Sequence, residues 1–280
     1  MKQVKFIFII IIINFSWSIG LKSLLFPVDA ISMASSNAGI AQSESVKINP
    51  AIILSQKSNS LSVSLNKWLG DIKGNSLSHY WRDKYVYINS YQVDGIELWG
   101  TSPQDEAIGD FSVRWLCIAY GQGFKVNDNL HLGLESKGIY SRLYTQTTKG
   151  ILGNIGLIYK YNEKYKLGLT AKNFGYLDSE LNEDYPLEFG LGFGWNLSQK
   201  ICLKLDVVEN NSTDMVLRSS VDAILNFFTF TAGMSHYDSN QYFSGGIKLD
   251  YRHWSIRYGI LSQEVQALGT PYSIQLTLNY

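Results

Sequence analysis

The side chains that could support catalysis or metal binding are few and scattered. The four histidines, His79, His131, His236 and His253, lie in different segments without the short spacings that bring metal ligands together. A serine and a histidine on neighbouring strands could form a nucleophile–base pair. Serines are so frequent here, however, that one near a histidine is expected by chance. We therefore expect no catalytic residue, no metal and no cofactor, and a protein that is not an enzyme.

The N-terminal stretch indicates export. Lys2 and Lys5 precede an apolar run over residues 6–15, and the small residues Ser18 and Gly20 follow at the usual cleavage positions. This arrangement predicts a signal peptide over residues 1–20. The alternative, a membrane-anchoring helix, needs roughly twenty apolar residues, about twice the length of this run.

Composition excludes some classes of partner. The chain has 24 basic and 24 acidic side chains, and loss of the two signal-peptide lysines leaves a net charge of about −2. Such a balance gives no basic footprint for nucleic acid. An aromatic content of 14% with 24 glycines is typical of a β-rich protein with aromatic belts.

A period of two in hydrophobicity dominates the mature chain and predicts strands. In "PLEFGLGFGWNL" the apolar residues Leu187 to Leu197 occupy every second position, and Glu188, Gly190, Gly192 and Gly194 lie between them. The same template predicts fourteen strands, near 59–68, 76–81, 85–93, 111–120, 128–137, 150–161, 165–173, 186–197, 201–209, 216–225, 227–236, 241–251, 254–261 and 271–280.

The connections between these strands alternate between long and short. The short ones include "RDK", "NEK" and "SQK", and the long ones include "DGIELWGTSPQDEAIGD" and "KGIYSRLYTQTTKG". An up-and-down outer-membrane barrel has this asymmetry, with short turns in the periplasm and longer loops outside. An even strand number places both termini on the same side, and the order of long and short connections makes this the short-turn side. We therefore predict an outer-membrane location in a Gram-negative bacterium, with both termini periplasmic.

The polar face of the strands favours a membrane barrel over a secreted β-sandwich or soluble barrel. A soluble core needs an apolar interior, whereas an apolar outside with a polar inside is what a bilayer requires. Five tryptophans near strand ends suit aromatic girdles: Trp68, Trp81, Trp115, Trp195 and Trp254. The inward charges are mixed in sign, which predicts pairing between neighbouring strands: Lys160, Lys166, Lys172, Lys204, Asp206, Arg218, Asp222, Lys248, Asp250 and Arg257.

Strand parity also bears on the two cysteines. Cys202 alternates with Lys204 on a polar face, and Cys117 has the same parity as Val113 and Trp115 on an apolar face. Side chains aimed at opposite faces cannot form a disulfide without distortion. We expect two free thiols.

The segment between the signal peptide and the first strand breaks the period of two. It is rich in small residues, with a predicted helix around Ala30–Ala41 and a turn at Asn49–Pro50. We expect it to form a plug inside or beneath the barrel, where a glycine-lined interior leaves room. The predicted organisation is a signal peptide at 1–20, a plug at 21–58 and a barrel at 59–280.

Short motifs connect the chain to a family. Met33-Ala34, Gly39-Ile40-Ala41 and Asn49-Pro50-Ala51 resemble the start of the PorV/PorQ family of FadL-like outer-membrane barrels. "KNFG" at 172–175, "IRYGI" at 256–260 and the closing "YSIQLTLNY" are similar to later parts of that family. The resemblance implies a fourteen-stranded barrel with an N-terminal plug, and the plug motif would comprise Gly39, Ala41, Asn49, Pro50 and Ala51.

The resemblance also implies a function and partners. PorV/PorQ proteins act with the type IX secretion machinery, so the chain is expected to bind secreted cargo proteins or secretion components; the alternative is a FadL-like transporter of small hydrophobic solutes. Exposed aromatics on the long loops are candidate partner contacts: Trp99, Tyr140, Tyr144, Tyr176 and Tyr185. The last strand resembles the signal read by the barrel assembly machinery, with Tyr272, Ile274, Leu276 and Leu278 facing outer-membrane lipid and Tyr280 as terminal aromatic.

Overall fold

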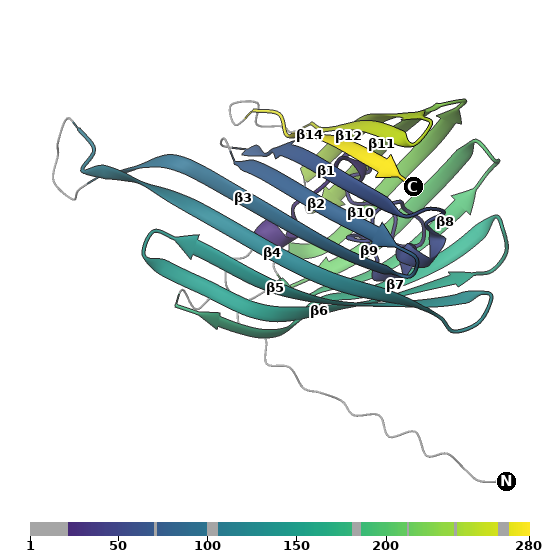
Figure 1. Ribbon diagram of the computed structural model, residues 1–280, viewed down its shortest axis with the longest axis horizontal. Coiled ribbons are helices and arrows are strands. Elements are labelled where there is room, and N and C mark those ends of the chain that lie inside the picture. The colour runs from purple at the N-terminus through teal and green to yellow at the C-terminus, as the bar shows by residue number, and fades with distance from the viewer. Residues whose placement is uncertain are drawn as a thin grey trace, which may run out of the picture.

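A computed structural model describes residues 22–69, 72–99, 106–180, 186–211, 213–237, 240–262 and 269–280. Fourteen antiparallel strands form a closed barrel in which each strand pairs with its neighbours in sequence and β14 pairs with β1 (Figure 1). This confirms the predicted fold class and strand number. The strands are β1 (Ser60–Lys67), β2 (Lys73–Trp81), β3 (Lys84–Leu98), β4 (Gly109–Lys125), β5 (Leu130–Leu143), β6 (Gln146–Lys160), β7 (Tyr165–Ser179), β8 (Glu188–Asn196), β9 (Ile201–Asn210), β10 (Thr213–Leu225), β11 (Phe228–Tyr237), β12 (Asn240–Tyr251), β13 (Trp254–Leu261) and β14 (Tyr272–Asn279).

The barrel has two different ends. At one end, which we call the short-turn end, β1 begins and β14 finishes. The turns here are short: residues 82–83 join β2 to β3, and residues 252–253 join β12 to β13. The opposite, long-hairpin end carries strands that continue well past the predicted limits. β5 and β6, for example, are joined by residues 144–145 alone, where a long loop was predicted. Beyond the apolar band both faces of a strand meet water, so the hydrophobic alternation stops although the hydrogen-bonded ladder continues.

The outer surface of the barrel is apolar and the inner surface is largely polar. On β8, Phe189 and Leu191 are half exposed while Gly190 and Gly192 are buried. At the seam, Leu61 pairs with Leu278, Val63 with Leu276 and Leu65 with Ile274. The predicted outward direction of Ile274 and Leu276 and the closure of β14 on β1 are confirmed. Closure satisfies every strand edge, as a bilayer requires.

Parity misassigns one stretch of β4. Val113, Trp115 and Cys117 point into the barrel, and Leu116, Ile118 and Tyr120 point out. Cys117 and Cys202 are both free, as predicted. The predicted reason, that they point to opposite faces, was wrong: both face inward, but they lie on distant strands, β4 and β9. The error has a physical cause: this part of the wall packs against the N-terminal segment, so its inner face is apolar too. Trp115 is accordingly not a girdle residue.

The N-terminal segment lies inside the barrel and is built from short elements: η1 (Lys22–Leu25), α1 (Ala30–Ala34) and η2 (Pro50–Ser55). The helix predicted over Ala30–Ala41 ends at Ala34, because Ser36 and Asn37 adopt positive φ of 51° and 59°. In the described part of the chain, no helix has the length and apolarity to cross a membrane. We call residues 22–56 the plug.

Candidate functional site

The plug is seated on glycines of the inner wall. An added Cβ at Gly133 of β5 would collide with the backbone of Pro50 and Ala51, and one at Gly156 of β6 with Asn49. Other wall positions have the same close approach to the plug: Gly123, Gly168, Gly192, Gly233, Gly246 and Gly259. The glycine-rich inner face seen in the sequence is thus the surface on which the plug backbone rests.

Asn49 links the plug to itself and to the wall. Its Nδ2 donates to the carbonyl of Ile40 at 2.7 Å and to that of Leu157 in β6 at 3.2 Å, and its Oδ1 accepts from Ala51 N at 2.9 Å. Pro50 opens η2 with its fixed φ, so no amide donor is lost. The predicted turn is therefore the capped start of a 3₁₀-helix.

Gly39 and Ile40 form a second anchor. Asp206 of β9 accepts the backbone N–H of Gly39 at 2.6 Å and that of Ile40 at 3.1 Å. Gly39 has a φ of +132°, a backbone conformation that glycine adopts readily and other residues rarely adopt. Ala41 is buried against Gly192 of the wall. These five motif residues are brought together by the fold into one plug–wall contact.

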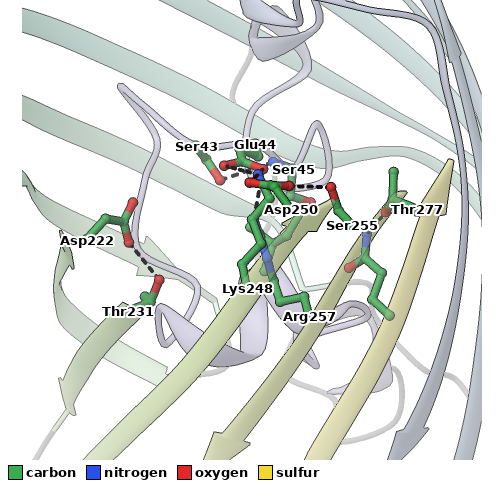
Figure 2. Close-up of polar contacts among 12 residues, drawn as sticks. Ser43, Glu44, Ser45, Asp222, Thr231, Lys248, Asp250, Ser255, Arg257 and Thr277 are labelled. Atoms are coloured by element: carbon green, nitrogen blue, oxygen red, sulfur yellow. Dashed lines mark hydrogen bonds and ion pairs between the residues drawn. The ribbon is translucent and has the colours of Figure 1, made fainter. Parts of the chain in front are cut away.

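Glu44 ties the plug to the opposite wall at the short-turn end. Its carboxylate pairs with Arg257 Nη2 of β13 at 2.8 Å and with Lys248 Nζ of β12 at 3.2 Å, as Figure 2 shows. Its side chain is half exposed within the barrel; enclosure by the barrel raises the pKa of Glu44, but Arg257 and Lys248 outweigh this effect and bring the pKa down to about 2. Asp250 extends the group by pairing with Lys248 at 3.1 Å.

The plug carries one buried ion pair of its own. Asp29 caps α1 by accepting from Ser32 N at 2.8 Å, and its Oδ2 lies 3.6 Å from Lys47 Nζ. Burial raises the pKa of Asp29, but Lys47 and the hydrogen bonds from Ser32 and Ser45 hold it below its ordinary value. Lys47 also donates to Ser76 and Asn89, which fixes the plug against β2 and β3.

Above the plug, toward the long-hairpin end, lies a small cavity that opens to solvent. One side is apolar and aromatic and comes from both plug and wall: Leu24, Leu25, Phe26, Tyr91, Trp115 and Ile139. Phe26 stacks on Trp68 with ring centroids 4.7 Å apart, and Leu24 packs against Ile139 and Leu152. The first described residues therefore form part of the cavity lining.

The floor and far side of the cavity are polar. Glu188 of β8 forms ion pairs with both Lys172 and Arg218, and the distance from its Oε2 to Arg218 Nη2 is 3.3 Å. Outside the cavity, in the polar space at the short-turn end, Lys204 pairs with Asp222 across β9 and β10. The predicted pairing of inward charges between strands is thus confirmed for four of the ten predicted residues: Lys172, Lys204, Arg218 and Asp222. Asp206, Lys248 and Arg257 instead hold the plug.

A buried carboxylate in this wall was missed by the sequence reasoning. Glu135 accepts from Tyr85 Oη at 2.7 Å, Tyr87 Oη at 3.0 Å and Asn154 Nδ2 at 2.6 Å. Its position between the inward-facing Gly133 and Lys137 in the alternating pattern of β5 was the available signal. Because three donors satisfy it, Glu135 joins strands β3, β5 and β6 behind the cavity.

The predicted partner aromatics do not share one kind of location. Trp99 follows β3 and Tyr144 lies in the β5–β6 turn, whereas Tyr140 and Tyr176 lie within β5 and β7 and not in loops. Tyr185 lies outside the described residues, as does the predicted signal peptide. At the other end, Tyr280 N donates to Asn59 O at 3.0 Å and its Oη lies 2.6 Å from His79 Nε2.

Within the described ranges, no group of three or more His, Cys, Asp or Glu side chains is arranged to hold a metal ion. No family model matches the chain, and no curated protein matches it.

Solved structures do match. The Pseudomonas putida toluene transporter TodX superposes with a TM-score of 0.65 at 12% identity, covering 90% of this chain and 98% of that one. The fold is of the FadL type. The monoaromatic hydrocarbon channel CymD gives a TM-score of 0.61 at 13% identity over 90% of this chain and 97% of its own, and a Pseudomonas aeruginosa FadL homologue gives 0.58 at 10% over 90% and 98%. The fold that the sequence resemblance implied is thus shown, whereas membership of the PorV/PorQ family is not.

Proposed function

We propose that the protein is an outer-membrane channel that binds and passes small hydrophobic solutes. The observation that carries this proposal is the cavity above the plug, whose apolar side combines plug residues Leu24 and Phe26 with wall residues Trp115 and Ile139. An apolar pocket with a few polar groups at one side is the usual form of a small-molecule site. The structural neighbours named as hydrocarbon channels support the same class of solute.

The plug gives such a channel its barrier. It separates the cavity from polar spaces at the short-turn end, which are lined by residues such as Lys204, Asp222, Thr231 and Arg257. A solute that reaches the cavity must therefore pass the plug or displace part of it. We infer a non-enzymatic role, because binding and passage need no reacting side chain.

Saturable binding of radiolabelled toluene to the purified protein in detergent micelles tests the proposal. Ser141→Trp should fill the cavity and abolish binding above that of empty micelles, because Ser141 is a small buried residue of its lining. Thr231→Trp is the matched control, since it places the same side chain in the polar space beyond the plug. Binding by Ser141→Trp equal to that of the wild type would refute the site.

A second candidate is the secretion role implied by the PorV/PorQ resemblance. It is favoured by exposed aromatics toward the long-hairpin end, where Trp99 is 51% and Tyr176 is 72% exposed. In this role they would contact secreted cargo proteins or type IX components. Co-purification from solubilised membranes should then recover such proteins, and Tyr176→Ser with Trp99→Ser should reduce recovery without changing toluene binding.

A further inference from the structure

Three basic residues form a row on the outward face of the barrel. Arg114 of β4 lies directly opposite Arg142 of β5 in the strand register, and Lys149 of β6 lies opposite Tyr140, two residues along β5 from Arg142. All three side chains are exposed. We call Arg114, Arg142 and Lys149 the outer basic row.

The row lies where the apolar band ends. On β4 the outward residues Leu116, Ile118 and Tyr120 are 38–48% exposed, and Arg114 is the next outward residue toward the long-hairpin end. Strands β4, β5 and β6 run side by side in Figure 1, so the three cations share one patch. A lipid whose acyl chains lie along these apolar side chains would bring its headgroup to the row.

The arginine pair is unfavourable unless an anion joins it. Residues directly opposite on one face of an antiparallel pair have Cβ atoms about 4.5–5.5 Å apart, and like charges there are destabilising. Among the described residues, no carboxylate forms an ion pair with either arginine. Arg142 Nε donates to the carbonyl of Tyr144 at 3.1 Å, and Lys149 pairs with Asp178 at 3.4 Å. The row therefore keeps a net positive charge.

Guanidinium groups bind phosphate through paired N–H donors, and phosphate is the anion found at this depth of a membrane. We propose that the outer basic row binds the phosphate group of a phosphorylated glycolipid in the leaflet at the long-hairpin end. Arg114 and Arg142 hold the phosphate between them, and Lys149 adds charge. Tyr140 and Tyr176, both exposed beside the row, contact the sugar and interfacial part of the lipid. The inference rests on the membrane placement in the proposed function and not on the solute carried.

Binding of diphosphorylated lipid A to the purified full-length barrel in neutral detergent, followed by native mass spectrometry, tests this site. The wild-type protein should retain lipid A, and Arg114→Gln with Arg142→Gln should lower the affinity at least about tenfold, as expected for losing two charge-assisted contacts. Lys125→Gln with Arg252→Gln is the matched control, because it removes two exposed charges at the short-turn end. The control variant should bind like the wild type.

Three results would overturn the proposal. One is equal affinity of the arginine variant and the wild type. Another is equal binding of dephosphorylated lipid A, which would assign the contact to acyl chains alone. The third is displacement of the lipid by inorganic phosphate at the lipid's own concentration, which would indicate a simple anion site. Unchanged heat-modifiable gel migration shows that the variants fold, and toluene binding measured on the same samples separates this test from that of the channel.

Discussion

Charged side chains hold the plug at points far apart along the barrel wall. Asp206 binds the backbone at Gly39 and Ile40, and Glu44 reaches Lys248 and Arg257 on strands across the interior. These contacts lie in the interior of the barrel, so loss of a partner would leave a charged group without the hydrogen bond or ion pair that offsets its desolvation. The inward charges thus position a segment that has little regular secondary structure of its own.

Glu44 predicts a pH dependence of this attachment. Its folded-state pKa of about 2 is below the ordinary value of 4.5, so its contribution is complete above about pH 4.5 and is lost as the pH falls toward 2. The thermal unfolding midpoint of the wild-type protein should therefore fall more steeply over this range than that of Glu44→Gln, which lacks the titrating group. Parallel pH profiles for the two proteins would show that Glu44 does not stabilise the fold through its charge.

At the scale of elements, the sequence predicted the strands better than the connections and the plug. A period of two persists wherever one face meets an apolar exterior, so all fourteen strands could be located. The extensions of β3 to Leu98 and of β5 to Leu143 could not be located from the sequence, because both faces of these segments are exposed to solvent and the hydrophobic alternation stops. Asn49-Pro50-Ala51 was recognised as a plug motif, but its contacts with Gly133 and Gly156 depend on strand register, which the sequence leaves open. The cavity was missed because it needs Leu24 and Phe26 next to Trp115.

Two glycines of β5 offer a matched test of plug seating. A Cβ at Gly133 would meet the backbone of Pro50 and Ala51, whereas one at Gly138 meets nothing within 4 Å. Gly133→Ala should destabilise the protein by about 1–3 kcal/mol, because neither backbone can easily move. Gly138→Ala should leave stability unchanged or slightly raised, since alanine loses less conformational entropy on folding. Denaturant unfolding in micelles, followed by tryptophan fluorescence, measures both; equal effects would mean that the plug does not rest on Gly133.

At the scale of the whole molecule, the barrel has an apolar outer surface and a largely polar inner surface. The outside carries exposed aliphatic residues, while the inside is largely polar and has apolar clusters where plug and wall meet. One of these contacts explains the parity error on β4, because Trp115 faces inward beside plug residues Leu24 and Phe26 in the lining of the cavity that we propose as the solute site. The barrel is therefore apolar on its outer face and, inside, where the plug packs against the wall.

Leu191 tests the outer of these surfaces. It lies on β8 between Leu169 of β7 and Val207 of β9, and all three are outward and 40–52% exposed. Leu191→Arg should cost about 2–4 kcal/mol of folding free energy in a bilayer, and Leu197→Arg, just past the end of β8, about 0–1 kcal/mol, because the cost falls from the midplane to the interface. Reversible unfolding from lipid vesicles measures the difference. In a protein whose outer surface faced water, both arginines would be tolerated equally, so a ratio near one between the two costs would exclude the membrane barrel.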